Sequence, residues 1–310
     1  MNGAIAEAAA ILREACDERL ATDFPMAPLT TFRIGGRAAL YLEPESDTDL
    51  LACTRAVNET GIGFALIGKG SNVLVSDAGF PGIVLRLGRG FRWAAREGAR
   101  LSAGAAMPLP ALAGIALGHR LAGLEFAVAI PATLGGSVKM NAGAHERSMS
   151  DVLERVEVFE LRAGRVRSIS SAEADLAYRR SGLSGDAVVV AATVLLSEAP
   201  SDHIRAKMEE ARAWRRRTQP LAEPNCGSVF RNPPGDHAAR LIEVTGAKGA
   251  RVGGARVSDK HANFIVADAG ARADDVVQLM YDVQAKVEAE HGVRLEPEVQ
   301  LIGEFEHARR

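Results

Sequence analysis

The sequence contains only three cysteines, Cys16, Cys53 and Cys226, which lie far apart and are odd in number. Their spacing excludes a disulfide framework and a CxxC metal pair, as is typical of proteins kept in a reducing compartment. The seven histidines include no HxxxH pair, so we expect no metal site. We therefore predict a cytoplasmic protein that binds no metal.

Long apolar runs and an excess of charge are also missing. No stretch approaches the roughly 18–20 apolar residues of a membrane-spanning helix, and the start, MNGAIAE, lacks the basic region and apolar core of a secretory signal. The 37 Lys and Arg residues nearly balance the 39 Asp and Glu residues, for a formal net charge of −2. Nucleic acid and anionic membrane surfaces select for basic proteins, so we expect neither as a partner.

The spacing of apolar residues predicts a mixed α+β protein. Helical spacing covers residues 5–20, 47–60 (opened by a capping box of Ser46 and Asp49), 109–121, 202–217 and 273–291. The runs DVLERVEVFEL and GRVRSIS predict a hairpin, AVVVAATVLL a buried strand, and RLEPEVQLIG a last strand. Strict βαβ alternation is absent, which argues against a doubly wound parallel sheet.

The length allows about two domains of roughly 150 residues. We expect an N-terminal helix and connector over 1–27, one domain over 28–200 and a second over 201–310, divided at Glu198-Ala199-Pro200-Ser201.

Aromatic residues make up only 5% of the chain, whereas glycine occurs 31 times, which favours binding loops built from backbone. The first such loop, Gly68-Lys69-Gly70-Ser71-Asn72, lies between the apolar runs FALI and VLV. It fails the P-loop pattern because Gly70 replaces Ser or Thr and a strand follows, and it lacks the third glycine and the helix of a dinucleotide fingerprint. Two interpretations remain: a backbone anion nest or a tight turn between strands.

A second glycine-rich loop covers residues 130–143, IPATLGGSVKMNAG. Its small residues let backbone approach a flat or charged ligand closely. Two such loops in one domain favour a bound dinucleotide.

Several segments occur in an order that carries a family resemblance: TTFRIGG (30–36), IGKGSNVLVSDAGFPGIVLRL (67–87), IPATLGGSVKMNAGA (130–144), YRRS (178–181), CGSVFRNPPG (226–235) and LEPEVQLIG (295–303). From Thr30 to Gly303 the chain resembles the UDP-N-acetylenolpyruvoylglucosamine reductase family. This resemblance implies an FAD-binding domain of the vanillyl-alcohol-oxidase (PCMH) type, made of two α+β subdomains, and then a smaller α+β substrate-binding domain. The implied activity is NADPH-dependent reduction, through bound FAD, of UDP-N-acetylglucosamine enolpyruvate to UDP-N-acetylmuramate in peptidoglycan synthesis.

The resemblance also assigns the FAD contacts to the two loops, at Gly68, Lys69, Gly70, Ser71, Asn72, Ile130, Pro131, Thr133, Gly135, Gly136, Asn141, Ala142 and Gly143. Ala129, Ala132 and Glu146 stand where the resemblance leads us to expect glycine.

Three catalytic residues follow from the same motifs. Arg179 of YRRS faces the substrate carboxylate, which a guanidinium binds through two parallel donors. Ser228 of CGSVF donates a proton to the strongly basic carbon, and Glu298 of LEPEV stabilises or protonates the enolic form. On a strand, Arg180 would point away from Arg179. The pattern alone does not separate Glu296 from Glu298, which the motif selects.

Arg231 and Asn232 are expected to contact the UDP diphosphate or sugar. The run Arg215-Arg216-Arg217 either binds phosphate or complements a helix C-terminus. Because the segment after Tyr178 is short, the chain resembles the family branch without an inserted tyrosine-bearing lid loop. Separately, we expect a monomer or weak dimer. The alternatives are a related FAD-dependent oxidase acting on another substrate and a non-catalytic flavin or UDP-sugar binding module.

Overall fold

The computed structural model describes residues 3–305. The chain packs into two compact units. Unit 1 contains the described residues of Met1–Thr22 together with Leu40–Lys69 and Gly82–Arg215. Unit 2 contains Asp23–Ala39, Gly70–Pro81 and the described residues of Arg216–Arg310. The domains expected over 28–200 and 201–310 are drawn from the composition of the sequence, whereas the two units are defined by packing. The expected domains stay a prediction.

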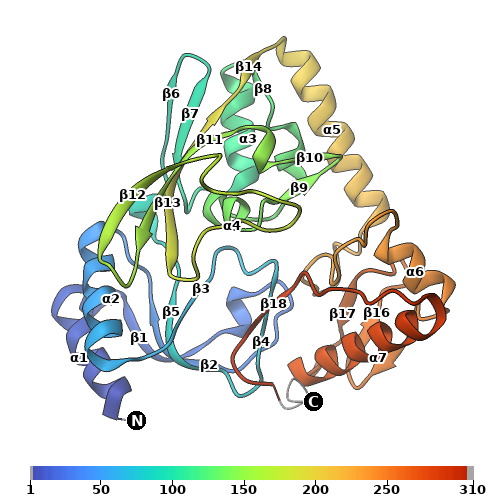
Figure 1. Cartoon of the computed structure of the whole chain (residues 1–310), viewed down its shortest axis with the longest axis horizontal. Helices are drawn as coiled ribbons and strands as arrows, with labels where there is room; N and C mark the ends of the chain where they lie inside the picture. Colours follow the sequence, from blue (N-terminus) through green and yellow to red (C-terminus); the bar gives the residue numbers. More distant parts are fainter. Residues whose placement is uncertain (1–2, 306–310) are drawn as a thin grey trace. The chain divides into compact units, whose positions relative to one another are not determined.

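Unit 1 is built around a five-stranded antiparallel sheet in the order β12-β11-β13-β7-β6 (Figure 1). Its strands are β6 (Ala94–Glu97), β7 (Arg100–Gly104), β11 (Leu153–Glu160), β12 (Arg165–Ser170) and β13 (Ala187–Leu195). β11 and β12 form the predicted hairpin, with Val158 opposite Arg167.

The central strand β13 is buried on both faces. Ala187 and Val189 join the core cluster that contains helix α3 (Leu109–Gly118), whereas Val188 and Val190 join the cluster that contains helices α1 and α2. Successive side chains of a strand point to opposite faces. A strand covered on both sides needs a continuous apolar run, which explains why AVVVAATVLL does not alternate with polar residues.

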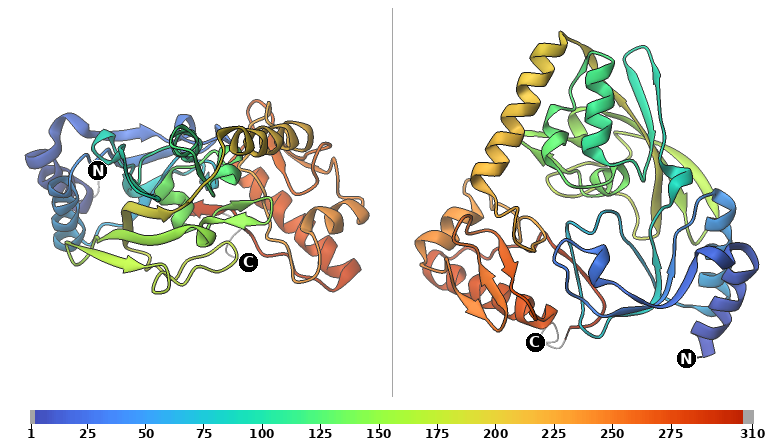
Figure 2. Two further views of the ribbon diagram at one scale, coloured as in Figure 1. Left: turned by 90° about the horizontal axis from the view of Figure 1, so that it is seen from above. Right: turned by 180° about the vertical axis from the view of Figure 1, so that it is seen from behind.

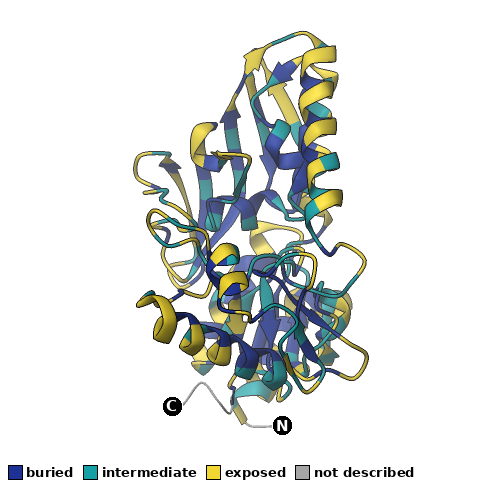
Figure 3. Ribbon diagram, turned by 90° about the vertical axis from the view of Figure 1, so that its right-hand side faces the viewer, coloured by how far each residue is buried: buried dark blue, intermediate teal, exposed yellow. Residues whose placement is uncertain are grey.

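Short elements and one long helix complete the core on the α3 side. They are β8 (Leu121–Ala122), η4 (Glu125–Ala129), α4 (Leu134–Lys139), β9 (Gly143–Ala144), β10 (Arg147–Ser148), η5 (Met149–Asp151), β14 (Ser197–Glu198) and α5 (Ser201–Thr218). Helix α5 buries Ile204, Met208 and Ala211 at helical spacing, while its outer face is exposed (Figure 3). The helix predicted over 202–217 is therefore confirmed.

Helices α1 (Gly3–Cys16) and α2 (Asp47–Thr60) lie side by side (Figures 1 and 2). The capping box of Ser46 and Asp49 is present at the start of α2, as predicted. The helix expected over 5–20 is wrong at its end, because the chain turns through η1 (Asp17–Arg19) into strand β1 (Leu20–Pro25). Thr22, Asp23 and Pro25 are poor helix formers, so the expected connector is partly strand.

A four-stranded sheet has the order β1-β2-β5-β3. Its other strands are β2 (Arg37–Leu42), β3 (Phe64–Leu66) and β5 (Phe80–Leu85), and β3 pairs with β5 in parallel. The 3-10 turns η2 (Ala27–Leu29) and η3 (Arg89–Phe91) flank these strands in the chain.

Unit 2 contains helices α6 (Ala238–Val244) and α7 (Ala273–His291) and a three-stranded sheet of β15 (Arg251–Val252), β16 (Ala255–Val257) and β17 (Ile265–Ala267). Strand β4 (Val73–Val75) pairs in parallel with the last strand, β18 (Gln300–Ile302). The strand expected over 294–303 is therefore shorter than predicted, because Pro297 offers no N–H to a ladder. Helix α7 begins and ends as predicted.

Candidate flavin and substrate site

The two glycine-rich loops meet in unit 1. A Cβ atom on Gly68 would lie 2.7 Å from Oγ1 of Thr133, closer than van der Waals contact allows. Residue 68 must therefore be glycine for the first loop to lie against the second. The sequence analysis assigned both residues to the cofactor, and the structure brings them together.

The first loop offers a row of unused backbone donors. Within residues 3–305, no N–H group of Gly68, Lys69, Gly70, Ser71 or Asn72 donates a hydrogen bond to another residue. Successive backbone N–H groups of this kind can form an anion-binding nest. These donors are therefore available to an anion, as the anion-nest interpretation requires.

The second loop is partly helical, which corrects our expectation of a loop throughout 130–143. Thr133 begins helix α4: its Oγ1 accepts a hydrogen bond from the N–H of Gly136 at 3.3 Å. Leu134 and Val138, four residues apart, are both fully buried in the unit 1 core. A Cβ on Gly135 would lie 2.9 Å from Cβ of Ala105, so the helix packs closely because residue 135 is glycine. Ile130 and Pro131 precede it directly after η4.

The second half of the first loop belongs to unit 2 and is held by Thr31. The N–H and Oγ1 of Thr31 donate to the carbonyl of Gly70 at 2.9 and 3.3 Å. Oγ1 of Thr31 also lies 2.6 Å from the carbonyl of Asn225. Gly70 has φ +69°, and a Cβ there would lie 2.0 Å from the carbonyl oxygen of Leu29. The sequence analysis did not identify Thr31 as a site residue, although it lies in the quoted segment TTFRIGG.

The segments that carry Ser228 and Glu298 lie side by side in unit 2. The N–H of Glu298 donates to the carbonyl of Val229 at 2.7 Å, and Phe230 and Pro297 form a bridge. The side-chain amide of Asn72 donates to the carbonyl of Glu298 at 3.2 Å. Ser228 and Glu298 are both half-buried. The structure thus brings together two of the predicted catalytic residues and the end of the first loop.

Asn263 fixes this pair of segments, and the sequence analysis missed it. Its carbonyl accepts from the N–H of Val229 at 2.9 Å, and its side chain exchanges two hydrogen bonds with the backbone of Phe230 at 3.0 and 2.8 Å. Asn263 is only 4% exposed. The signal in the sequence that could have identified it is an asparagine next to the apolar run of HANFIVA.

The structure separates the two glutamates that the pattern left together. Glu296 is exposed and pairs with Arg231 at 3.4 Å, whereas Glu298 is half-buried beside Val229. Burial raises the pKa of the nearby Cys226 thiol, and the negative charge of Glu298 raises it further. Cys226 therefore stays protonated and is no nucleophile.

Arg179 lies in a turn and not on a strand, which corrects the expected geometry. Ala177 and Arg180 exchange two backbone hydrogen bonds of 3.1 Å around Tyr178 and Arg179, and Arg179 has φ +56°. The guanidinium of Arg179 donates from Nη2 to the carbonyl of Gly143 at 2.9 Å. Arg180 instead forms an exposed ion pair with Asp175 at 3.6 Å. Arg179 and Arg180 differ in environment, as predicted, but the difference arises from the turn and not from alternation along a strand.

Of the residues expected near the UDP group, Asn232 has a structural partner. Oδ1 of Asn232 accepts from the N–H of Ala238 at the start of α6 at 3.1 Å, and burial lowers the pKa of Arg215. Of the residues at expected glycine positions, Glu146 adopts φ +61° in the turn between β9 and β10, whereas Ala129 and Ala132 have ordinary backbone angles. Glu146 therefore adopts the left-handed conformation that glycine adopts readily.

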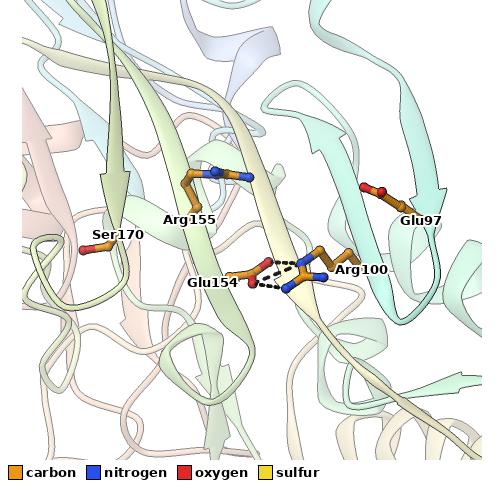
Figure 4. Close-up of a pocket in the computed structure, with 5 residues that line it drawn as sticks. All are labelled: Glu97, Arg100, Glu154, Arg155 and Ser170. Carbon is orange, nitrogen blue, oxygen red and sulfur yellow. Dashed lines mark hydrogen bonds and ion pairs between the residues drawn. The ribbon is translucent and has the colours of Figure 1, made fainter.

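A surface pocket lies elsewhere on unit 1. Glu97, Arg100, Glu154, Arg155 and Ser170 line it, and Arg100 binds Glu154 through two nitrogens (Figure 4). It contains no predicted site residue. Residues 3–305 contain no group of three or more metal-ligating side chains and no helix long and apolar enough to cross a membrane.

Comparison with known proteins matches this architecture on both halves of the chain. An FAD binding domain model matches residues 38–170, and the model of the UDP-N-acetylenolpyruvoylglucosamine reductase C-terminal domain matches residues 219–302. The fold and the matching domain models thus define an FAD-binding α+β protein of the vanillyl-alcohol-oxidase type, as predicted.

Relatives identify the family. The UDP-N-acetylenolpyruvoylglucosamine reductase of Heliobacterium modesticaldum is 45% identical over 282 residues, 90% of each chain. That of Anaeromyxobacter sp. is 45% identical over 285 residues, 91% of this chain and 88% of the relative. The crystal structure of MurB from Thermus caldophilus superposes with a TM-score of 0.79 at 36% identity, over 92% of this chain and 98% of that one. The chain belongs to the UDP-N-acetylenolpyruvoylglucosamine reductase family.

Proposed function

We infer that this chain reduces the enolpyruvyl group of UDP-N-acetylglucosamine enolpyruvate to give UDP-N-acetylmuramate, with FAD as the bound cofactor and NADPH as the reductant. The observation that carries this inference is the pairing of the Ser228 and Glu298 segments beside Asn72 of the first loop, in a chain of this family. UDP-N-acetylmuramate is a precursor of peptidoglycan, so the reaction serves cell-wall synthesis.

The residues of the two loops fit an FAD. The unused N–H groups of residues 68–72 suit a pyrophosphate, and the small residues of the second loop leave its backbone accessible to a flat ring. We propose that the loops hold the cofactor through Gly68, Lys69, Gly70, Ser71, Asn72, Ile130, Pro131, Thr133, Gly135, Gly136, Asn141, Ala142 and Gly143. When bound, FAD supplies the hydride that no side chain can deliver.

We propose that Arg179 binds the substrate carboxylate. Negative charge spreads onto this carboxylate as the double bond is reduced, and a fixed guanidinium stabilises it. The turn and the contact with Gly143 hold Arg179 in place before substrate arrives, so little reorganisation is needed.

Ser228 and Glu298 have complementary roles in this proposal. The hydroxyl of Ser228 donates a proton to the carbon next to the carboxylate, which is basic enough to accept it. Glu298, half-buried on the neighbouring segment, stabilises or protonates the enolic form. Arg231, whose Nε is buried, and Asn232 contact the UDP diphosphate or the sugar.

The wider setting follows from the same function. We propose a cytoplasmic enzyme, because its nucleotide substrates are cytoplasmic and its three cysteines are free and buried. We further propose that it acts as a monomer or weak dimer and has neither nucleic acid nor membrane partners.

Anaerobic oxidation of NADPH tests the function. We expect sustained oxidation only when UDP-N-acetylglucosamine enolpyruvate is present, with one UDP-N-acetylmuramate formed per NADPH consumed. A single stoichiometric loss of flavin absorbance that the enolpyruvyl sugar does not reverse would contradict the proposed substrate. It would support a flavin oxidase that acts on another substrate. A protein that binds flavin but oxidises no NADPH would be the non-catalytic module.

A further inference from the structure

The turn that carries Arg179 is small and strained. It consists of Tyr178 and Arg179, closed by the two hydrogen bonds between Ala177 and Arg180, and Arg179 lies in the left-handed region at φ +56°. Tyr178 is 52% exposed, so the turn is not buried by its own side chains. Such a conformation persists only where the surroundings determine it.

Asn141 supplies this determination from a buried position. It is 4% exposed, and its Nδ2 donates to the carbonyl of Ala177 at 2.9 Å. Its Oδ1 accepts from the N–H of Ser150, also at 2.9 Å. A donor facing a carbonyl and an acceptor facing an N–H fix the orientation of the amide. Asn141 therefore ties the base of the turn to the segment that follows β10.

The neighbouring residues reinforce the same connection. Gly143, two residues after Asn141, accepts the hydrogen bond from the guanidinium of Arg179 at 2.9 Å. Lys139, two residues before it, accepts from the hydroxyl of Ser181 at 2.8 Å through its carbonyl. Residues 139–143 thus contact the turn at three places: at Ala177 before it, at Ser181 after it, and at the guanidinium of Arg179.

We propose that Asn141 is a positioning residue for Arg179: its side-chain amide sets where the guanidinium lies, while its backbone belongs to the flavin loop. This rests on the proposed role of Arg179. Because a displacement of about 1 Å in a charged group can cost roughly a hundredfold in rate, the loss of this one amide should slow substrate reduction by the flavin-loaded protein.

Asn141→Asp is the sharpest variant. It keeps the shape and the acceptor for Ser150, but it turns a carboxylate oxygen toward the carbonyl of Ala177. We expect a tenfold to hundredfold slower return of flavin absorbance on addition of the enolpyruvyl sugar, on the order of a 1 Å displacement. The rates are compared on the flavin-loaded fraction of each protein, and the NADPH-driven loss of absorbance is recorded as a separate step.

Asn58→Asp is the matched control. Nδ2 of Asn58 also donates to a backbone carbonyl, that of Arg162 at 2.9 Å, at an exposed position. We expect unchanged rates. If Asn141→Asp does not fold, Asn141→Gly replaces it, since glycine suits φ +42° at this position and removes the amide.

A double-mutant cycle with Arg179→Lys separates positioning from other roles. If Asn141 acts through Arg179, the double variant should be no slower than Arg179→Lys alone. Slowing by the product of the two single effects would overturn the proposal, because Asn141 and Arg179 would then act independently. Arg179→Lys at the full rate would instead overturn the proposed role of Arg179.

Discussion

Five residues other than glycine adopt left-handed backbone angles in the stretch between α4 and β13: Asn141 at φ +42°, His145 at +53°, Glu146 at +61°, Asp175 at +43° and Arg179 at +56°. Each costs roughly 1–2 kcal/mol relative to ordinary angles, and asparagine bears this cost best. The ring of His145 packs edge-on against Trp214 at 5.0 Å between centroids. Side-chain contacts thus stabilise the strained backbone of this stretch, which includes Arg179, the residue to which we assign the substrate carboxylate.

At the same scale, Glu298→Gln tests the assignment of the catalytic glutamate. The amide keeps the size of the side chain but neither carries the charge nor releases a proton. We expect substrate reduction to fall by about 10²–10⁴-fold, with the NADPH-driven loss of flavin absorbance unchanged. Stopped-flow absorbance without oxygen measures both steps.

Glu296→Gln is the control, because Glu296 is exposed and contacts Arg231 at 3.4 Å. It should retain full activity. A slow Glu296 variant beside a fast Glu298 variant would show that the wrong glutamate was chosen.

The sequence pattern could not make this choice. Alternation along a strand places Glu296 and Glu298 on one face. Pro297 interrupts the ladder, however, and backbone hydrogen bonds to residues 229–231 fix which of the two carboxylates is half-buried. Arg179 was likewise identified by motif, whereas its turn depends on Asn141 and Gly143, more than 30 residues away in the chain. Residue types were predictable here, but their contacts were not.

At the scale of elements, Asp49 shows how a local signal is coupled to packing. It is 4% exposed; its Oδ2 accepts from the N–H groups of Glu45 and Ser46 at 2.7 and 3.1 Å, and its Oδ1 pairs with Arg19 at 2.7 Å. The start of α2 is thus joined to the segment that follows α1.

Asp49→Asn should lower the free energy of unfolding by about 1–3 kcal/mol, because one oxygen cannot serve both sets of donors and the charge on Arg19 loses its partner. The loss of stability stays in this range because the side chain of Arg19 is 35% exposed, so that water screens its charge. Urea denaturation at saturating FAD measures it. Asp47→Asn, at the exposed first position of α2, should change stability by only a few tenths of a kcal/mol, and an equal effect of both substitutions would contradict the role of Asp49.

Elements with such local signals were predictable. Helices α2, α5 and α7 carry clear apolar spacing or caps and lie where the sequence places them. Helix α4 does not: its two glycines disfavour a helix, and it forms because Leu134 and Val138 reach a core made by distant strands. The end of α1 was mistaken for the same reason, since β1 depends on partners elsewhere in the chain.

At the scale of the molecule, unit 2 is assembled from separate pieces of the chain. Phe32 and Leu74 lie in its core, 1% and 0% exposed. The Asp77 carboxylate accepts from the N–H groups of Ala273 and Asp274 at 3.0 and 3.1 Å, which caps helix α7. Local patterns report no such long-range partners, so the sequence alone suggested a single division near residue 200.

This assembly predicts that residues 201–310 alone do not fold cooperatively. The fragment lacks Phe32 and Leu74, each worth about 2–5 kcal/mol when buried, and strand β18 loses its only partner in the described chain, β4. Small domains have only about 5–15 kcal/mol of stability, so these losses together remove most of it. We expect the fragment to show poor amide dispersion by NMR and no cooperative urea transition, whereas the full chain shows one. A cooperative transition in the fragment would establish residues 201–310 as an independent domain, and it would mean that residues 23–39 and 70–81 are attached to that domain without being needed for its fold.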